Sequence, residues 1–306
     1  MNGPLPVVSV VISTYNRCEK LERALKSALA QTLKSIEIII VDNASEDRTA
    51  EFVKSVEDQR IRYIRHDTNK GGPAARNTGI KTAQASLVAL LDDDDEWLPR
   101  KLELQVKKFQ ESSPCVGLVY VGTEVFDEHK NKILRTNLPA FRGNVYQRLL
   151  MGTILGSVSS VLVKKECFEK AGLFDEQLTS CQDWDMWLCI ARYYEFEYVS
   201  EVLARINMHG DQISTNYASL IPGRTRMVKK HWEEFQEYPE ILIVHLKRIG
   251  KLHCLNGTWA EAINWFKKAA AVRKIEIFKI AAWCLLELPL VKFSSYNRSF
   301  KRYIKQ

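Results

Sequence analysis

The sequence predicts an α/β fold in which a mostly parallel sheet carries helices on both faces, followed by an α-helical C-terminal extension. Two observations predict it. Over the first hundred residues, short apolar runs typical of buried strands alternate with segments of helical periodicity. From about residue 221 onward the chain instead becomes basic, with apolar residues at helical spacing.

The first elements follow a strand–helix–strand rhythm. Strand-like runs occupy residues 7–12, 36–41, 61–64 and 87–91. Between the first two runs, one helical face is formed by Leu21, Ala24, Leu25, Ala28 and Leu29. Pro73, preceded by two glycines, marks the start of a further helix. Ligands of such sheets bind beyond the carboxyl ends of the strands, and Asp42 and Asp92 stand there.

The middle of the chain has a different pattern. Residues 117–160 are β-rich and irregular, 166–172 and 182–193 are helical in pattern, and 196–202 are extended. We therefore expect a catalytic domain at 1–220, with a nucleotide-binding half at about 1–115 and an acceptor-binding half at about 116–220. A basic helical region at 221–306 completes the predicted organisation.

Charge is unevenly distributed along the 306 residues, whose net charge is +7. Residues 221–306 carry 17 Lys and Arg against 7 Asp and Glu, and the first 220 residues carry 27 against 30. This basic tail, which also holds four of the seven tryptophans, suggests an anionic partner, and we expect a membrane surface rather than nucleic acid. The apolar stripe Ile277–Leu288 lies in a segment too charged to span a bilayer.

The cysteines and the N-terminus bear on the compartment. The seven cysteines form no CxxC pair and no metal-ligand spacing, which is typical of a reducing compartment. No basic segment precedes the first apolar run, so we expect no signal peptide. The predicted location is cytoplasmic, with peripheral attachment to the inner face of the membrane.

The strongest chemical signal is the run of four aspartates from Asp92 to Asp95, directly after an apolar strand. Adjacent carboxylates repel one another and lose solvation, unless a cation neutralises them. A hard divalent ion with oxygen ligands fits that need. The alternative is a solvated acidic turn, and the buried strand before the run argues against it.

Four weaker signals each have a structural alternative. The glycine turn before Arg76 suits phosphate, although such turns into helices are common. Asp42 suits either a base edge or a helix cap. Asp183 and Asp185 lie two residues apart, so they do not share a helix face and only one is expected to face a common site. His209 is, by itself, an ordinary surface or packing histidine.

Five motifs in order resemble glycosyltransferase family 2, whose members are inverting enzymes of the GT-A fold. They cover about residues 6–215 and read VSVVISTYNR, VDNASEDRT, NKGGPAARNTG, LDDDDEWLP and GLFDEQLTSCQDWDMWL. The resemblance implies that Asp42 accepts the N–H of a uracil base and that Arg76 lies near the phosphates. It also implies that the turn Thr14-Tyr15-Asn16 lines the base pocket.

The same resemblance assigns the carboxylates. The Asp-x-Asp element maps onto Asp92 and Asp94, so that Asp92 and Asp93 are implied on the nucleotide side and Asp94 on a divalent metal, Mn²⁺ or Mg²⁺. The motif also fits one residue later, as Asp93-x-Asp95, and this alternative stays open. Asp92 or Asp95 are therefore alternate metal ligands. His209 matches a late histidine that completes the metal shell in related members.

The acceptor-side base of the family falls on Asp183. Gln182 stands where the family usually has a glutamate, and glutamine cannot take a proton, so the base narrows to Asp183. The predicted reaction moves a sugar from a nucleotide-diphosphate donor, with a UDP-sugar expected, to a hydroxyl of a saccharide or lipid-linked acceptor. The role expected for it is in cell-surface polysaccharide synthesis.

Two rival functions fit the sequence less well. A nucleotidyltransferase would favour a glycine-rich loop after the first strand, but that turn reads STYNR. A non-catalytic, membrane-associated scaffold would be favoured by loss of the base or of the metal carboxylates, and both are present.

Overall fold

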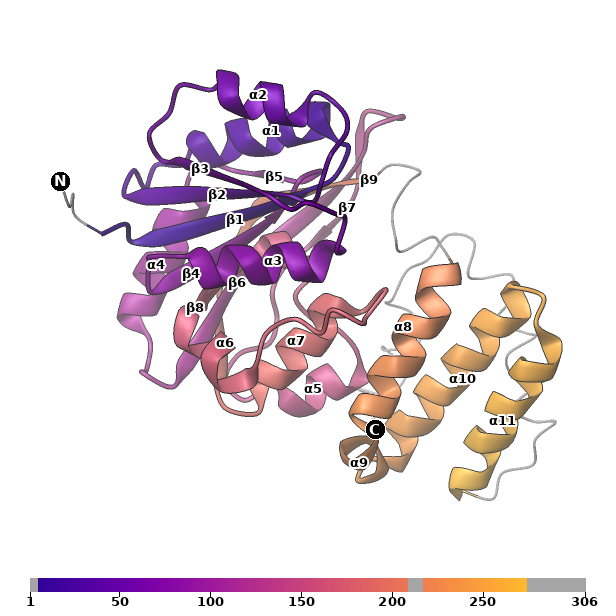
Figure 1. Cartoon of the computed structure of the whole chain (residues 1–306). Helices are drawn as coiled ribbons and strands as arrows, with labels where there is room; N and C mark the ends of the chain where they lie inside the picture. The colour runs from indigo at the N-terminus through magenta and orange to yellow at the C-terminus, as the bar shows by residue number, and fades with distance from the viewer. Residues whose placement is uncertain (1–4, 209–216, 274–306) are drawn as a thin grey trace. The chain divides into compact units, whose positions relative to one another are not determined.

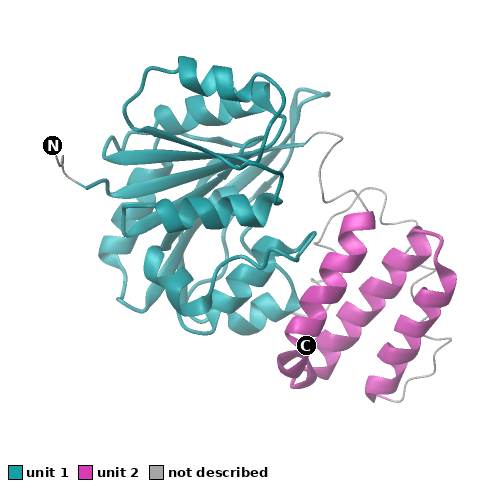
Figure 2. Cartoon of the chain, viewed as in Figure 1, with its two compact units in different colours: residues 1–212 teal, residues 213–306 magenta. Residues whose placement is uncertain are grey.

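The computed structural model describes residues 5–208 and 217–273. The chain divides into two compact units, residues 1–212 and 213–306 (Figure 2). The boundary predicted at residue 220 falls inside a helix of the second unit, α8 (Tyr217–Lys230). His209, as well as the apolar stripe Ile277–Leu288, lies outside the described residues.

Within the described residues, the first unit is built on a nine-stranded mixed sheet (Figure 1). Its strands run in the order β3-β2-β1-β4-β8-β6-β9-β5, and β7 pairs with β6. The bounds are β1 Val8–Thr14, β2 Ile36–Asp42, β3 Ile61–Arg65, β4 Leu87–Asp92, β5 Glu96–Trp97, β6 Val116–Asp127, β7 Lys132–Asn137, β8 Val161–Lys164 and β9 Glu195–Met208. The first four strands are parallel, as the sequence predicts.

Helices cover both faces of the parallel strands, so β1 is buried on both sides (Figure 1). On one face α1 (Cys18–Leu29), α2 (Thr49–Ser55) and α4 (Lys101–Glu111) share a core with Val8, Val10 and Ile12. On the other face α3 (Gly72–Thr82) packs on Val11, the intervening residue of the same strand.

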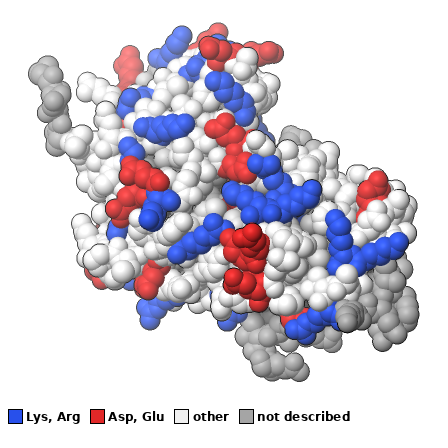
Figure 3. All heavy atoms as spheres, turned by 60° about the horizontal axis from the view of Figure 1, so that its bottom comes forward, with Lys and Arg blue, Asp and Glu red and all other residues white. Residues whose placement is uncertain are grey.

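The second half of the unit adds antiparallel pairs to the sheet. β8 runs antiparallel to both β4 and β6, whereas β6 and β9 are parallel with register shifts between Val116 and Leu118 and on both sides of Gly122. The helices here are α5 (Tyr146–Met151), α6 (Lys165–Ala171) and α7 (Gln182–Ala191), and a short 3-10 helix, η1, spans Val158–Ser160. Acidic and basic side chains are interspersed over the face of this unit that Figure 3 shows.

The described part of the second unit is helical. It contains α8, α9 (Trp232–Gln236), α10 (Pro239–Leu255) and α11 (Trp259–Arg273). Helices α10 and α11 form a hairpin in which Phe266 packs so closely on Gly250 that a Cβ there would meet the ring at 2.3 Å. Within the described residues no helix has the length and apolar character needed to cross a bilayer.

Candidate active site

The carboxyl ends of the parallel strands bring distant segments together. In the register of the sheet, Thr14 lies opposite Asp42, and Ser13 lies opposite Asp92. The turns that follow β1, β2 and β4 therefore meet at one edge. Residues separated by almost eighty positions, such as Thr14 and Asp93, make a direct hydrogen bond of 2.8 Å there.

The turn after β4 divides its four aspartates into two kinds. Oxygen atoms of Asp92, Asp94 and Asp95 lie within 4.8 Å of one another. Asp93 instead turns toward the segment after β1, where it accepts hydrogen bonds from Thr14 and from Arg17 (3.1 Å). Within the described residues, the shared cluster therefore contains both ends of the Asp92-x-Asp94 element.

Asp93 is a buried carboxylate with a cationic neighbour. Burial, together with the nearby charge of Asp94, raises the pKa of Asp93 to about 6, although Arg17 and Thr14 act in the opposite direction. The Arg17 guanidinium also contacts Asp94 at 3.1 Å. Arg17 thus neutralises part of the negative charge of the turn on the side facing β1.

The donor set of the shared cluster fits a hard divalent cation. All of its atoms are carboxylate oxygens, the ligands that Mg²⁺ and Mn²⁺ favour. Asp92 and Asp94 are partly exposed and Asp95 is 3% exposed, so a ligand approaching from solvent reaches the first two. Burial and the charges of Asp94 and Asp92 hold the pKa of Asp95 well above its ordinary value. A bound cation would relieve that repulsion.

Arg76 on α3 links the carboxylate turn to α7. Its guanidinium donates to Asp92 Oδ1 at 2.7 Å and to Gln182 Oε1 at 3.0 Å, and it lies over the Phe174 ring. Asp183, the next residue, is partly exposed. Burial raises the pKa of Asp183, and the charge of Arg76 opposes that rise. Asp183, the predicted base, is thus adjacent to Gln182, an uncharged side chain that Arg76 binds. Arg76 also binds Asp92 of the aspartate cluster.

The Asp42 side chain is fully buried, with both of its oxygens occupied. One oxygen accepts the backbone N–H of Ser45 at 2.8 Å, and the other accepts the hydroxyl of Tyr63. Arg65 Nε lies 3.7 Å away. Helix α2 begins only at Thr49, so Asp42 orders the turn after β2 instead of capping that helix. A contact of Asp42 with a base stays a prediction.

The turn after β1 is fixed to the turn after β2. Asn16 has a left-handed backbone, with φ of 52°, and its side chain accepts the N–H of Glu46 at 2.7 Å. Its own N–H donates to Ser45 Oγ at 2.9 Å. Tyr15 is 41% exposed at the tip of this turn. The two turns thus form one hydrogen-bonded wall with an aromatic ring available to a ligand.

A family comparison decides the class of protein. Residues 9–170 match the model of glycosyl transferase family 2. The chain belongs to glycosyl transferase family 2. It is therefore a glycosyltransferase, and the resemblance noted in its motifs is confirmed.

Related glycosyltransferases cover most of the chain. The uncharacterized glycosyltransferase MJ1057 of Methanocaldococcus jannaschii is 31% identical over 76% of this chain and 82% of its own length. WcaA of Escherichia coli (strain K12), provisionally named a colanic acid biosynthesis glycosyl transferase, is 31% identical over 75% of this chain and 83% of its own length.

Solved structures of S. aureus TarS share the fold at low identity. The crystal structure of TarS aligns with a TM-score of 0.60 and 16% identity over 87% of this chain, but over only 50% of the TarS chain. TarS 1–349 in complex with UDP-GlcNAc aligns with a TM-score of 0.58 and 14% identity over 86% of this chain and 91% of that one. These similarities confirm the GT-A fold.

Three residues of this family 2 site are not among the site residues predicted from the sequence, although Arg17 ends the motif VSVVISTYNR. Arg17 pairs with Asp93, Tyr63 donates to Asp42, and Ser159 lies against the aspartate turn. Arg17 has a signal, since it is a cation directly after the turn at the end of β1. Tyr63 lies in a strand and Ser159 in an irregular region, and no sequence pattern connects them to the site.

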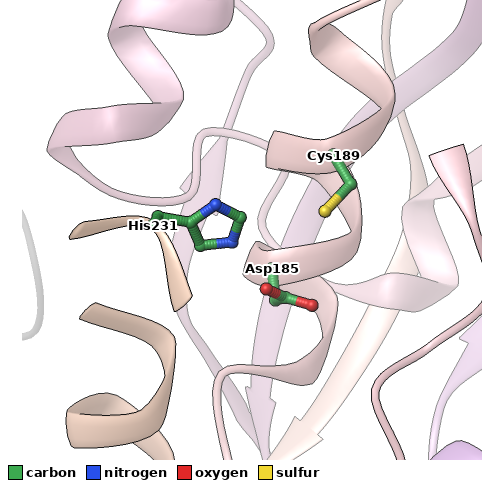
Figure 4. Close-up of side chains that lie close together, drawn as sticks. All are labelled: Asp185, Cys189 and His231. Atoms are coloured by element: carbon green, nitrogen blue, oxygen red, sulfur yellow. The ribbon is translucent and has the colours of Figure 1, made fainter. Parts of the chain in front are cut away.

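The two aspartates of helix α7 differ in solvent exposure. Asp185 is buried, and Cys189 follows one helical turn later (Figure 4). Figure 4 also labels His231, which precedes α9 in the second unit. Asp183 is partly exposed and Asp185 is 0% exposed, so of these two aspartates only Asp183 is reached by solvent.

Proposed function

We propose that the protein is a metal-dependent, inverting glycosyltransferase that moves a sugar from a UDP-sugar to a hydroxyl of a saccharide or lipid-linked acceptor in polysaccharide synthesis. The main support is the path of hydrogen bonds through Arg76. It joins Asp92, on the carboxylate turn, to Gln182, the neighbour of Asp183. Groups suited to a donor diphosphate and to an acceptor hydroxyl thus lie on two sides of one arginine.

A uridine donor is supported by the wall around Asp42 and by the similarity to TarS. The turns after β1 and β2 present Tyr15 for stacking on a base, beside the polar segment that Asp42 orders. TarS has been crystallised with UDP-GlcNAc and with UDP. Only a share of the TarS chain aligns, so the sugar and the acceptor of TarS are not transferred to this chain.

The proposed reaction is a single displacement at the anomeric carbon. Asp183 accepts the proton of the acceptor hydroxyl as that oxygen bonds to the anomeric carbon and the diphosphate leaves from the opposite face. One displacement inverts the configuration, because no carboxylate forms a covalent intermediate. Arg76 stabilises the developing charge of the leaving group.

The cation belongs to the carboxylate turn. Asp94 would hold it together with Asp92 or Asp95, whose oxygens lie in the same cluster, and His209 is the further ligand implied by the family. When bound, a divalent cation neutralises part of the charge of the diphosphate. Arg17, already paired with Asp93 and Asp94, keeps the rest of the turn compensated.

A donor panel tests the proposed function. UDP-, GDP- and dTDP-sugars are incubated with the protein, with Mn²⁺ or Mg²⁺ or with excess chelator, and release of the nucleotide diphosphate is measured. We expect turnover of a UDP-sugar with metal only, and loss of that turnover by at least about 10²-fold in Asp94→Ala with the fold retained. Full activity in chelator would contradict the metal requirement, and equal use of GDP-sugars would contradict the preference for a uridine donor.

We also propose that the second unit attaches the enzyme to an anionic membrane surface. Its described residues 217–273 carry ten Lys and Arg against five Asp and Glu. Helix α11 exposes Trp259 (56%) and Ile263 (49%), and Lys267 and Lys268 follow on the same helix. An exposed tryptophan beside lysines suits the boundary between headgroups and acyl chains.

A further inference from the structure

Ser159, in the short helix η1, holds both ends of the aspartate turn with one hydroxyl. The hydroxyl donates to Asp95 Oδ2 at 2.6 Å and accepts the backbone N–H of Asp92 at 3.1 Å. A serine hydroxyl has one proton, and here it goes to the carboxylate because the backbone N–H is itself a donor. Ser159 is fully buried, so water does not replace either bond.

The Asp95 carboxylate receives two further donors. Ser157 Oγ lies 3.2 Å from the same oxygen, and the N–H of Asn207 lies 3.3 Å from the other. Asp95 is thereby restricted in rotation, with one of its oxygens kept within 4.8 Å of one oxygen each of Asp92 and Asp94. Groups behind metal ligands set their orientation in this way.

The segment that carries Ser159 is itself fixed from the opposite side. Trp97 Nε1 donates to the Ser159 carbonyl at 2.7 Å, and Gln105 Nε2 on α4 donates to the Ser160 carbonyl at 3.0 Å. Lys101, also buried, lies 4.0 Å over the Trp97 ring. The segment cannot shift without breaking several buried hydrogen bonds, each of which costs free energy to leave unmade.

We propose that Ser159 is a positioning residue that sets Asp95 and Asp92 at the separation needed to bind a divalent cation. The inference rests on the metal-dependent transfer proposed above. Without the hydroxyl, Asp95 loses its shortest hydrogen bond and the N–H of Asp92 loses its acceptor. The carboxylates are then free to move apart under their mutual repulsion.

The test is direct binding of Mn²⁺ to the full chain, measured by electron paramagnetic resonance with and without UDP. In Ser159→Ala we expect the Mn²⁺ dissociation constant to rise about 10- to 100-fold. Ser160→Ala is the matched control. It removes a buried hydroxyl of the same segment that shares its proton between the carbonyls of Leu155 and Ser157 and does not donate to Asp95, so Mn²⁺ affinity is expected to stay unchanged.

The outcomes separate the inference from the proposed function. If the native chain binds Mn²⁺ and Ser159→Ala binds it equally well, the positioning role is overturned while the metal site stands. If the native chain binds no Mn²⁺ under either condition, the metal site itself is overturned. A Ser160→Ala loss equal to that of Ser159→Ala would assign both effects to packing, against the proposal. Should Ser159→Ala not fold, Ser157→Ala carries the same test, with a smaller loss expected.

Discussion

At the scale of single residues, the four aspartates after β4 differ through their hydrogen-bond partners. Asp93 and Asp95 point inward, at 4% and 3% exposure, and each meets buried hydroxyl donors. Asp92 and Asp94 are partly exposed and pair with Arg76 and with Arg17, the arginine that also pairs with Asp93. The inward pair therefore fixes the shape of the turn, while the outward pair is the one that a ligand from solvent would reach.

The base assignment predicts a specific loss in Asp183→Asn. The amide cannot accept the acceptor proton, so we expect kcat to fall by about 10² or more while the affinity for UDP changes little. Steady-state kinetics and calorimetry with UDP measure the two effects. Asp185→Asn is the comparison, since Asp185 is buried two residues away. A severe loss in Asp185→Asn with a mild loss in Asp183→Asn would show that the base has been assigned to the wrong carboxylate.

The same assignment predicts the acid side of the pH profile. The carboxylate is active only when deprotonated, so kcat/KM should fall as the pH drops through its pKa. Because burial raises the pKa of Asp183, this fall should occur at a higher pH than the ordinary aspartate pKa of about 4. The fall should disappear from the residual activity of Asp183→Asn, and a fall that persists there belongs to another group.

At the scale of elements, the distance between α3 and β1 places Arg76 over the strand ends. Gly79 permits that distance, because a Cβ there would lie 2.2 Å from Val11 Cγ1. Three residues earlier on the same helix, Arg76 reaches Asp92 at 2.7 Å. A helix displaced from the sheet would carry the arginine away from the carboxylate turn.

Gly79→Ala should therefore destabilise the protein, although alanine favours helices. We expect a loss of about 2 kcal/mol from overpacking, measured by denaturant unfolding. Gly72→Ala is the control. Its Cβ would meet only the Arg76 guanidinium, with Nη1 at 3.6 Å and Cζ at 4.0 Å, so the change should be within about 0.5 kcal/mol. The double variant Val11→Ala, Gly79→Ala should lose less unfolding free energy than the two single variants lose together. Strictly additive losses would contradict a direct contact between the two residues.

At the scale of the whole molecule, charge divides the protein into two parts. The first 220 residues carry 27 Lys and Arg against 30 Asp and Glu, and the remainder carries 17 against 7. A slightly acidic catalytic unit and a basic helical region suit an enzyme whose acceptor is presented at an anionic surface. The residues proposed for catalysis all lie in the first unit.

Vesicle co-sedimentation tests the membrane proposal. The chain should pellet with anionic vesicles at low salt, less at high salt because salt screens the attraction, and hardly at all with neutral lipid. Replacing Trp259 and Ile263 by serine should weaken binding. The same replacement of Ile133 and Leu134, exposed by 50% and 41% on β7 of the first unit, is the control and should leave it unchanged. Absence of binding at every salt concentration would contradict the proposal.

The sequence by itself determined the parallel half of the fold and the residue types of the site. Periodicity located β1 to β4, since buried strands need continuous apolar runs, and a carboxylate directly after such a run must lie at the edge where ligands bind. Motif order then indicated the family that the comparisons confirm.

Only the tertiary structure decided how these residues are partnered. The separation of Asp93 from the Asp92, Asp94 and Asp95 cluster depends on Arg17 and Thr14, which reach it across the sheet. The contact of Ser159 with the turn spans more than sixty residues, and its segment has no periodic pattern. Hydrogen bonds between distant segments depend on register and side-chain direction, and neither is encoded in local sequence.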